Sequence, residues 1–151
     1  MILAFSDEET VMLDFDETPF KLVRYWARRV SRRFKLGGFI IAKSSENNYH
    51  IIFNKRVNWT ENMSIVAWTA LESRKEKLRT WFIMQCIKKW STLRVSAKGE
   101  KPAPRVVYRE GEQENQITAY LEYRKMARRI WASLYIEPSD ENGGEIGGQP
   151  V

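Results

Sequence analysis

Two aspartates, Asp14 and Asp16, lie one residue apart in an apolar segment and are the side chains of this sequence best placed to do chemistry. The segment 11–16 has the composition of a β-strand, in which side chains alternate between two faces. Both aspartates are therefore expected on one face, roughly 7 Å apart, with Leu13 and Phe15 on the other. Two carboxylates placed this way repel each other and are costly to desolvate. A divalent metal ion between them would remove both costs, which makes the pair a candidate metal site.

The only histidine, His50, follows one helix later in the second strand of a predicted hairpin. An acid pair followed by a single histidine in a hairpin is the strongest functional pattern of the chain. Each part also has a structural interpretation. Asp16 precedes Glu17-Thr18-Pro19, a good N-terminal signal for a helix, and a lone histidine in a hairpin is more often structural than a ligand. Both interpretations are open at this point.

The charged residues are strongly segregated along the chain. Residues 1–20 contain six acids and residues 136–151 four more, and neither segment has a lysine or arginine. All 25 basic residues therefore fall within 21–135, which carries a formal charge of +16 together with its nine acids. Such a field attracts polyanions, so nucleic acid or a nucleotide is the expected partner. A solvated basic surface without a ligand is the structural alternative.

Length and composition are typical of a globular protein of one domain. The 151 residues contain one cysteine, Cys86, which excludes an internal disulfide and is predicted to be a buried, unreactive thiol. No signal peptide or long apolar span is evident, so a cytoplasmic location without a membrane partner is expected. The single histidine excludes the two-histidine metal site of rolling-circle initiators, and the lack of cysteine pairs excludes zinc fingers. A helix-turn-helix over 60–89 stays open.

The spacing of apolar residues predicts one α+β domain over residues 1–136, with an antiparallel-rich sheet and helices packed mainly on one face. The predicted strands are 1–5, 11–16, 39–43, 49–54, 93–96 and 105–108. The predicted helices are 19–35, 60–73, 76–89 and 115–135. The first begins with Thr18 as its N-cap and ends at Gly37-Gly38. Residues 137–151 are acidic, contain several Gly and Pro residues, and are predicted to form a disordered tail.

Helical spacing also predicts which side chains are buried. The first helix is expected to bury one apolar face and to present Arg28-Arg29 and Arg32-Arg33, interpreted first as a solvated surface and second as a stripe that follows a phosphate backbone. Tyr49 and Trp59 are expected to be exposed and able to stack on bases. The third helix is expected to bury Leu78, Trp81, Phe82, Met84 and Cys86. The last helix is expected to bury some combination of Ile117, Tyr120, Leu121, Met126, Ile130 and Leu134.

Three segments of the chain, in this order, resemble the catalytic core of archaeo-eukaryotic primases. They are Val11–Asp16, Lys43–Phe53 and Thr92–Lys98. The likeness is greatest to the primase–polymerase domains carried by archaeal plasmids and viruses, and it covers roughly residues 10–110. It implies an RRM-like core and a nucleotidyltransferase that acts on DNA with nucleoside triphosphates.

The resemblance also implies roles for individual residues. Asp14 and Asp16 match the family's metal-binding motif, which implies Mg²⁺ or Mn²⁺ in a two-metal site that acts on the incoming nucleotide. His50 matches the histidine that contacts the nucleotide's phosphates and completes the implied catalytic set. The residues implied in nucleotide or DNA binding are Ser44, Ser45, Asn48, His50, Arg94 and Lys98.

The chain departs from the family pattern in two places. Asn48 stands where the family usually has a small hydroxyl residue. The third motif normally supplies another carboxylate shortly before the segment that holds Arg94, and residues 87–92 contain none. The nearest substitutes are Glu72, Glu76, Glu110 and Glu112, or a residue of a second subunit. A degenerate core that binds DNA without catalysis, in a plasmid, virus or replication system, is therefore the alternative function.

Overall fold

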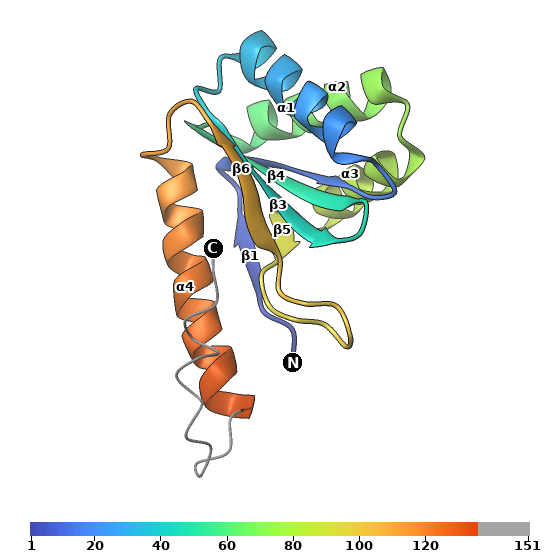
Figure 1. Cartoon of the computed structure of the whole chain (residues 1–151). Helices are drawn as coiled ribbons and strands as arrows, with labels where there is room; N and C mark the ends of the chain where they lie inside the picture. Colours follow the sequence, from blue (N-terminus) through green and yellow to red (C-terminus); the bar gives the residue numbers. More distant parts are fainter. Residues whose placement is uncertain (136–151) are drawn as a thin grey trace.

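A four-stranded antiparallel sheet lies at the centre of the computed structural model, which describes residues 1–135 (Figure 1). Its strands, in spatial order, are β2 (Thr10–Phe15), β4 (Asn48–Arg56), β3 (Phe39–Ser45) and β6 (Arg105–Glu110). Two short strands, β1 (Ala4–Asp7) and β5 (Ser91–Arg94), pair with each other in a second antiparallel sheet. The predicted tail, 137–151, lies outside the described residues.

Three helices cover one face of the large sheet, and the fourth covers the other face (Figure 1). The three are α1 (Phe20–Phe34), α2 (Trp59–Ser73) and α3 (Glu76–Lys88), which pack on Leu13, Ile41 and Ile51. On the opposite face, α4 (Gln116–Tyr135) packs with β1 and β5 on Met12, Ile40 and Ile52. This arrangement confirms an α+β domain with an antiparallel-rich sheet and helices mainly on one face. The RRM-like core stays a prediction.

The start of α1 differs from the prediction at its N-cap. Pro19, in an extended conformation, is the residue that precedes the first helical turn. The Thr18 hydroxyl, predicted to cap the helix, donates instead to the carbonyl of Asp16 (2.8 Å). The Thr18 backbone N–H donates to the carbonyl of Asn47 (2.8 Å). Thr18 therefore ties the end of β2 to the β3–β4 turn, which holds the acid pair against the hairpin.

A close backbone crossing joins the end of α1 to the loop between β6 and α4. Lys35 ends α1 in the left-handed conformation, and Gly37 follows with a φ of 82°. Gly38 then passes the backbone of Gly111 and Glu112 so closely that a Cβ on Gly38 would lie 2.1 Å from the Glu112 carbonyl oxygen. Only a residue without a side chain fits this crossing, which fixes where β3 begins and where β6 ends.

Burial in the helices differs from the prediction at several side chains. Met84 and Cys86 on α3 are exposed. On α4, Ile117 and Tyr120 are buried as predicted, Leu121 is partly buried against the same cluster, and the other three apolar residues of the predicted set are exposed. The exposed apolar residues of α4 are Met126, Ile130 and Leu134. None of the helices within residues 1–135 is long and apolar enough to cross a membrane.

Two aromatic side chains predicted to be exposed pack into the core instead. Tyr49 is only 6% exposed, because it alternates with His50 along β4 and therefore faces α1. Its ring centroid lies 5.7 Å from that of Phe20. Trp59 is partly buried against the same core. The burial of Tyr49 therefore argues against its predicted role in stacking on bases.

Candidate functional site

A pocket of about 370 Å³ opens where β2 ends, beside the β3–β4 hairpin and β5. Its size lies within the range typical of small-molecule sites. All the site residues predicted from the sequence line it: Asp14, Asp16, Ser44, Ser45, Asn48, His50, Arg94 and Lys98. The pocket is completed by Ile2, Ala4, Thr92, Leu93 and Lys101.

The register of the sheet brings the acid and the histidine together. Asp14 on β2 pairs with His50 on β4, and His50 pairs on its other side with Ala42 on β3. Leu13 and Phe15 point into the core beneath α1, α2 and α3. Asp14 therefore points to the opposite face of the sheet, as the strand alternation predicted.

Asp14 is a largely buried carboxyl group, one oxygen of which has no hydrogen-bond partner within residues 1–135. Its side chain is 21% exposed, and its Oδ1 makes no hydrogen bond. Burial, followed by the negative charge of Asp16, raises the pKa of Asp14 to about 7, against the opposing effect of Arg94. Near neutral pH the carboxyl group is therefore divided between its protonated and ionised forms. A cation beside it would favour the ionised form.

His50 is buried beside this carboxyl group and is neutral at physiological pH. Its Nε2 lies 3.8 Å from Oδ1 of Asp14. Burial, with a smaller effect from the charge of Arg94, lowers the pKa of His50 to about 3. The contact is therefore not an ion pair at pH 7. The Nδ1 atom has no hydrogen-bond partner, and a neutral imidazole carries one N–H donor and one acceptor.

The acid pair fits a divalent cation that also binds a substrate. The unpartnered Oδ1 of Asp14 and the carboxylate of Asp16 are hard oxygen ligands of the kind that Mg²⁺ and Mn²⁺ prefer. Within the described residues, no group of three or more His, Cys, Asp or Glu side chains is arranged to hold a metal ion. Magnesium is commonly bound by one or two carboxylates together with substrate phosphates. The pair therefore suits a metal ion that arrives with a nucleotide.

Ser44, Ser45 and Asn48 brace the hairpin turn at the edge of the pocket. The Asn48 side chain donates to the Ser45 hydroxyl (2.6 Å) and accepts from the backbone N–H of Glu17 (2.8 Å). The Ser44 hydroxyl donates to the Asn48 carbonyl (3.1 Å). Asn48 therefore has a structural role at this turn. The Ser45 hydroxyl accepts in its bond with Asn48, so its own proton is available to a ligand.

Arg94 is fixed by three backbone carbonyl groups. Its guanidinium donates to the carbonyls of Ser96, Pro102 (2.9 Å) and Ser44 (3.3 Å). These bonds tie the β5–β6 connection to the β3–β4 hairpin. Carbonyl acceptors do not neutralise the guanidinium, so the positive charge of Arg94 acts within the pocket, where it opposes the rise in the pKa of Asp14.

Lys98 and Lys101 reach the pocket from one tight turn. The backbone N–H of each donates to the carbonyl of the other (3.0 and 2.9 Å), and Gly99 between them has a φ of 58°. The sequence predicted Lys98 but not Lys101, although two lysines flanking a glycine turn were the available signal. The chain continues from this turn into β6 rather than into a helix, so the turn is not a phosphate-binding P-loop.

No third carboxylate reaches the pocket from residues 1–135. Among the lining residues only the two aspartates are acidic. Glu72 and Glu110 form ion pairs with arginines of α1 (3.1 and 2.9 Å). Glu76 and Glu112 do not line the pocket either. The four substitutes considered from the sequence therefore lie elsewhere.

Comparisons of this chain with models of protein families, with curated proteins and with solved structures give no match. The resemblance to archaeo-eukaryotic primases therefore stays an inference from the sequence.

Proposed function

We propose that this chain is a primase–polymerase-like nucleotidyltransferase module that binds a nucleoside triphosphate with a divalent metal ion and acts on DNA. One observation carries the proposal. Residues selected from the sequence, in segments as far apart as Asp14 and Lys98, line a single pocket of about 370 Å³. That pocket combines a carboxylate pair, a neutral imidazole and cationic side chains, which are the groups that phosphoryl transfer requires.

Three cations give the pocket the charge to bind a triphosphate. Arg94 is held in place by backbone carbonyls and offers a fixed positive charge. Lys98 and Lys101 are flexible point charges on one turn and can follow phosphate oxygens. Charge-assisted hydrogen bonds from such groups to phosphate are about twice as strong as neutral ones. The three cations therefore support an anionic substrate beside the acid pair.

Asp14 and Asp16 would hold Mg²⁺ or Mn²⁺, which supplies activation of the attacking 3′ hydroxyl and neutralisation of charge on the leaving pyrophosphate. Asp14 must be ionised for this role. A neighbouring cation has the required effect, because it lowers the pKa of Asp14 from about 7.

His50 contributes as a neutral hydrogen-bond donor. Its pKa of about 3 excludes a charged imidazolium at physiological pH. An N–H group fixed in a largely buried site can stabilise charge that develops on a phosphoryl oxygen without reorganising during the reaction. His50 is therefore proposed to position the phosphate, while Arg94, Lys98 and Lys101 neutralise it.

Incorporation of a labelled nucleotide on a single-stranded DNA template, with Mg²⁺ or Mn²⁺, tests the proposal. The wild type is compared with Asp14→Asn/Asp16→Asn and with Glu61→Gln/Glu122→Gln, which removes the same charge from exposed positions on α2 and α4. Product is expected from the wild type and the control, and loss of product from the aspartate variant. Folded wild type that binds nucleotide and metal yet forms no product would refute the enzymatic function.

A non-catalytic DNA-binding protein is the second candidate function. It is favoured by the lack of a third acidic side chain among the described residues of the pocket, since two carboxylates would hold a second metal ion weakly. This function predicts DNA binding that persists in EDTA and in Asp14→Asn, with no nucleotide incorporation. Metal-dependent product from the wild type would exclude it.

A further inference from the structure

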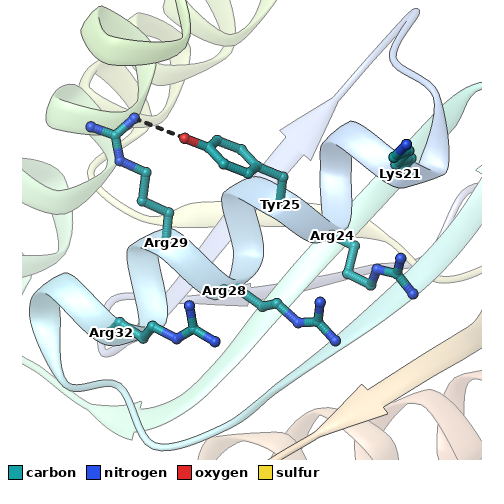
Figure 2. A pocket seen from close by; sticks show the side chains of 6 residues that line it. All are labelled: Lys21, Arg24, Tyr25, Arg28, Arg29 and Arg32. Carbon is teal, nitrogen blue, oxygen red and sulfur yellow. Dashed lines mark hydrogen bonds between the residues drawn. The ribbon is translucent and has the colours of Figure 1, made fainter.

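The outer face of α1 carries a basic surface that is separate from the pocket. A second depression, about 460 Å³ in volume, is lined by Lys21, Arg24, Tyr25, Arg28, Arg29 and Arg32 (Figure 2). None of these residues lines the pocket that holds the acid pair. The surface therefore needs an explanation of its own.

The cations form a continuous stripe along the helix. At about 3.6 residues per turn, Lys21, Arg28 and Arg32 follow one line. Figure 2 shows Arg24, Arg28 and Arg32 extending to one side of α1, with Tyr25 and Arg29 on the other side. From Lys21 to Arg32 the stripe is about 16 Å long, at a rise of about 1.5 Å per residue.

Part of this stripe is held rigid by neighbouring groups. The Arg24 guanidinium lies 5.6 and 5.7 Å from the ring centroids of Phe20 and Tyr108. Arg28 donates to Glu110 (2.9 Å) and to the Tyr108 hydroxyl (3.0 Å). Ordered side chains lose less conformational entropy when they bind a ligand. Arg24 and Arg28 are therefore already ordered before a ligand binds, unlike freely solvated arginines.

Three of the cations form no ion pair within residues 1–135. Arg28 and Arg29 form ion pairs with Glu110 and Glu72. Lys21, Arg24 and Arg32 form none with any residue in 1–135. The charge of Arg32 also acts on Glu110. The stripe still has more cations than acidic partners, and this excess of positive charge complements the regular spacing of phosphates in a nucleic-acid strand.

Tyr25 adds an exposed aromatic ring to the same depression, on the other side of α1 from Arg24 and Arg28. The residue is 51% exposed, and its ring stands edge-on to that of Trp26, with the centroids 5.3 Å apart. Its hydroxyl accepts a hydrogen bond from Arg29 (3.4 Å). Single-stranded nucleic acids bind to surfaces that combine cations for the backbone with aromatic rings on which unpaired bases stack. The bases of a duplex are already stacked on one another and are therefore not available to stack on such a ring.

We propose that the outer face of α1 binds single-stranded nucleic acid, with Lys21, Arg24 and Arg32 contacting phosphates and Tyr25 stacking on a base. The stripe begins five residues after Asp16, so its first cation lies within about 18 Å of the acid pair along the chain. Because α1 packs on the sheet face opposite Asp14, the stripe and the pocket are separate surfaces. This inference goes beyond the proposed function, because binding on α1 needs neither a metal ion nor catalysis.

The test measures anisotropy of a fluorescein-labelled oligothymidylate and of a duplex of equal length, in EDTA. Lys21→Gln/Arg24→Gln/Arg32→Gln is expected to weaken binding to the single strand by about tenfold or more at about 0.1 M salt, and to lower the slope of log K against log salt by about 2. The control, Lys55→Gln/Arg79→Gln/Lys125→Gln, removes the same charge from exposed positions on three other elements. It is expected to change affinity by less than about threefold.

Tyr25→Ala tests the choice of a single strand and keeps the charge unchanged. It is expected to weaken binding to the oligothymidylate by about fivefold or more and to leave duplex binding unaltered. Equal losses in the two triple variants would overturn the proposal in favour of a diffuse field. A Tyr25→Ala variant without effect would also overturn it. Circular dichroism establishes folding, and Arg32→Gln alone replaces the triple variant if that variant unfolds.

Discussion

Replacing Asp14 by asparagine is expected to stabilise the metal-free protein at alkaline pH. The carboxyl group is buried, its Oδ1 has no hydrogen-bond partner, and Asp16 repels its ionised form. Asparagine has nearly the same shape and carries no charge. The substitution therefore removes the cost of desolvating a carboxylate, even though it removes a residue on which the proposed function depends.

The pKa of Asp14 determines how large this effect is. Its value rises from 3.8 to about 7 on folding, so the stabilising contribution of the protonated group is complete below pH 3.8 and is lost as pH rises through about 7. At about 1.36 kcal/mol per pH unit, the whole loss is about 4 kcal/mol, of which about 3 kcal/mol falls between about pH 5 and pH 8.5. The asparagine variant has no such loss.

Urea unfolding in EDTA at about pH 5 and pH 8.5 measures the difference. The variant's free energy of unfolding, relative to wild type, should increase by about 3 kcal/mol between the two pH values. His50, whose lowered pKa gives a stabilising contribution that is present above pH 6.5 and lost as pH falls toward 3, is present in both proteins and largely cancels. Glu8→Gln, which removes an exposed charge from the β1–β2 turn, is the control.

A relative stability of Asp14→Asn that stays constant from pH 5 to pH 8.5 would refute this reasoning. It would mean that the carboxylate of Asp14 is as well solvated in the folded protein as in the unfolded chain. Glu8→Gln is expected to stay within about 0.5 kcal/mol of wild type at both pH values.

The remaining predictions concern the histidine, the backbone crossing and the arginine anchor. In Asp14→Asn, which removes the neighbouring carboxyl group that itself titrates near pH 7, the imidazole C–H resonances of His50 should show no titration between pH 5 and pH 8, because burial holds its pKa at about 3; a midpoint near 6.5 would contradict this. Gly38→Ala should lower the free energy of unfolding by more than about 2 kcal/mol, because its Cβ would lie 2.1 Å from the Glu112 carbonyl oxygen. Gly99→Ala, with open space around it, should cost only about 1 kcal/mol for its left-handed backbone. Arg94→Gln should speed tryptic cleavage after Lys98, because the carbonyl bonds that hold this connection are lost; unchanged cleavage would mean that the turn is held by other contacts.

The parts of the site that depend on local periodicity could be predicted from the sequence. Strand alternation has a period of two residues, so it placed Asp14 opposite Leu13 and Phe15 without any knowledge of the tertiary structure. The same alternation places Tyr49 and His50 on opposite faces of the sheet. The burial of Tyr49, however, depends on α1, which packs across the face that carries Tyr49. Such packing is a tertiary effect that the local pattern does not contain.

The parts that depend on pairing between distant segments could not be predicted. The pairing of β1 with β5 joins Ala4 to Arg94 and brings the N-terminal strand to the pocket wall. No periodicity in either short segment specifies that partner. The exposed stripe of α4 has the same origin, because the side of the helix that is buried was decided by its contact with β1, β5 and the sheet.

Within the part of the chain that the structure describes, only two carboxylates line the pocket, which affects how ligands bind. Two acidic side chains leave most of the coordination of Mg²⁺ or Mn²⁺ to water and to substrate phosphates. The metal ion and the nucleotide should therefore bind cooperatively, and each should raise the affinity of the other by the same factor. We expect Mn²⁺ to bind about tenfold or more tightly when a non-hydrolysable triphosphate analogue is present, within the usual range of such coupling.

Titration of Mn²⁺ followed by electron paramagnetic resonance, with and without the analogue and corrected for the metal–nucleotide complex in solution, measures this coupling. Asp14→Asn should abolish it, whereas Glu61→Gln/Glu122→Gln should leave it intact, because neither glutamate lines the pocket. Equal Mn²⁺ affinity with and without the analogue would show that the metal ion does not share its coordination with the phosphates. The acid pair and the cationic side chains would then act independently, and the argument that joins Asp14 and Asp16 to Arg94, Lys98 and Lys101 as one nucleotide site would fail.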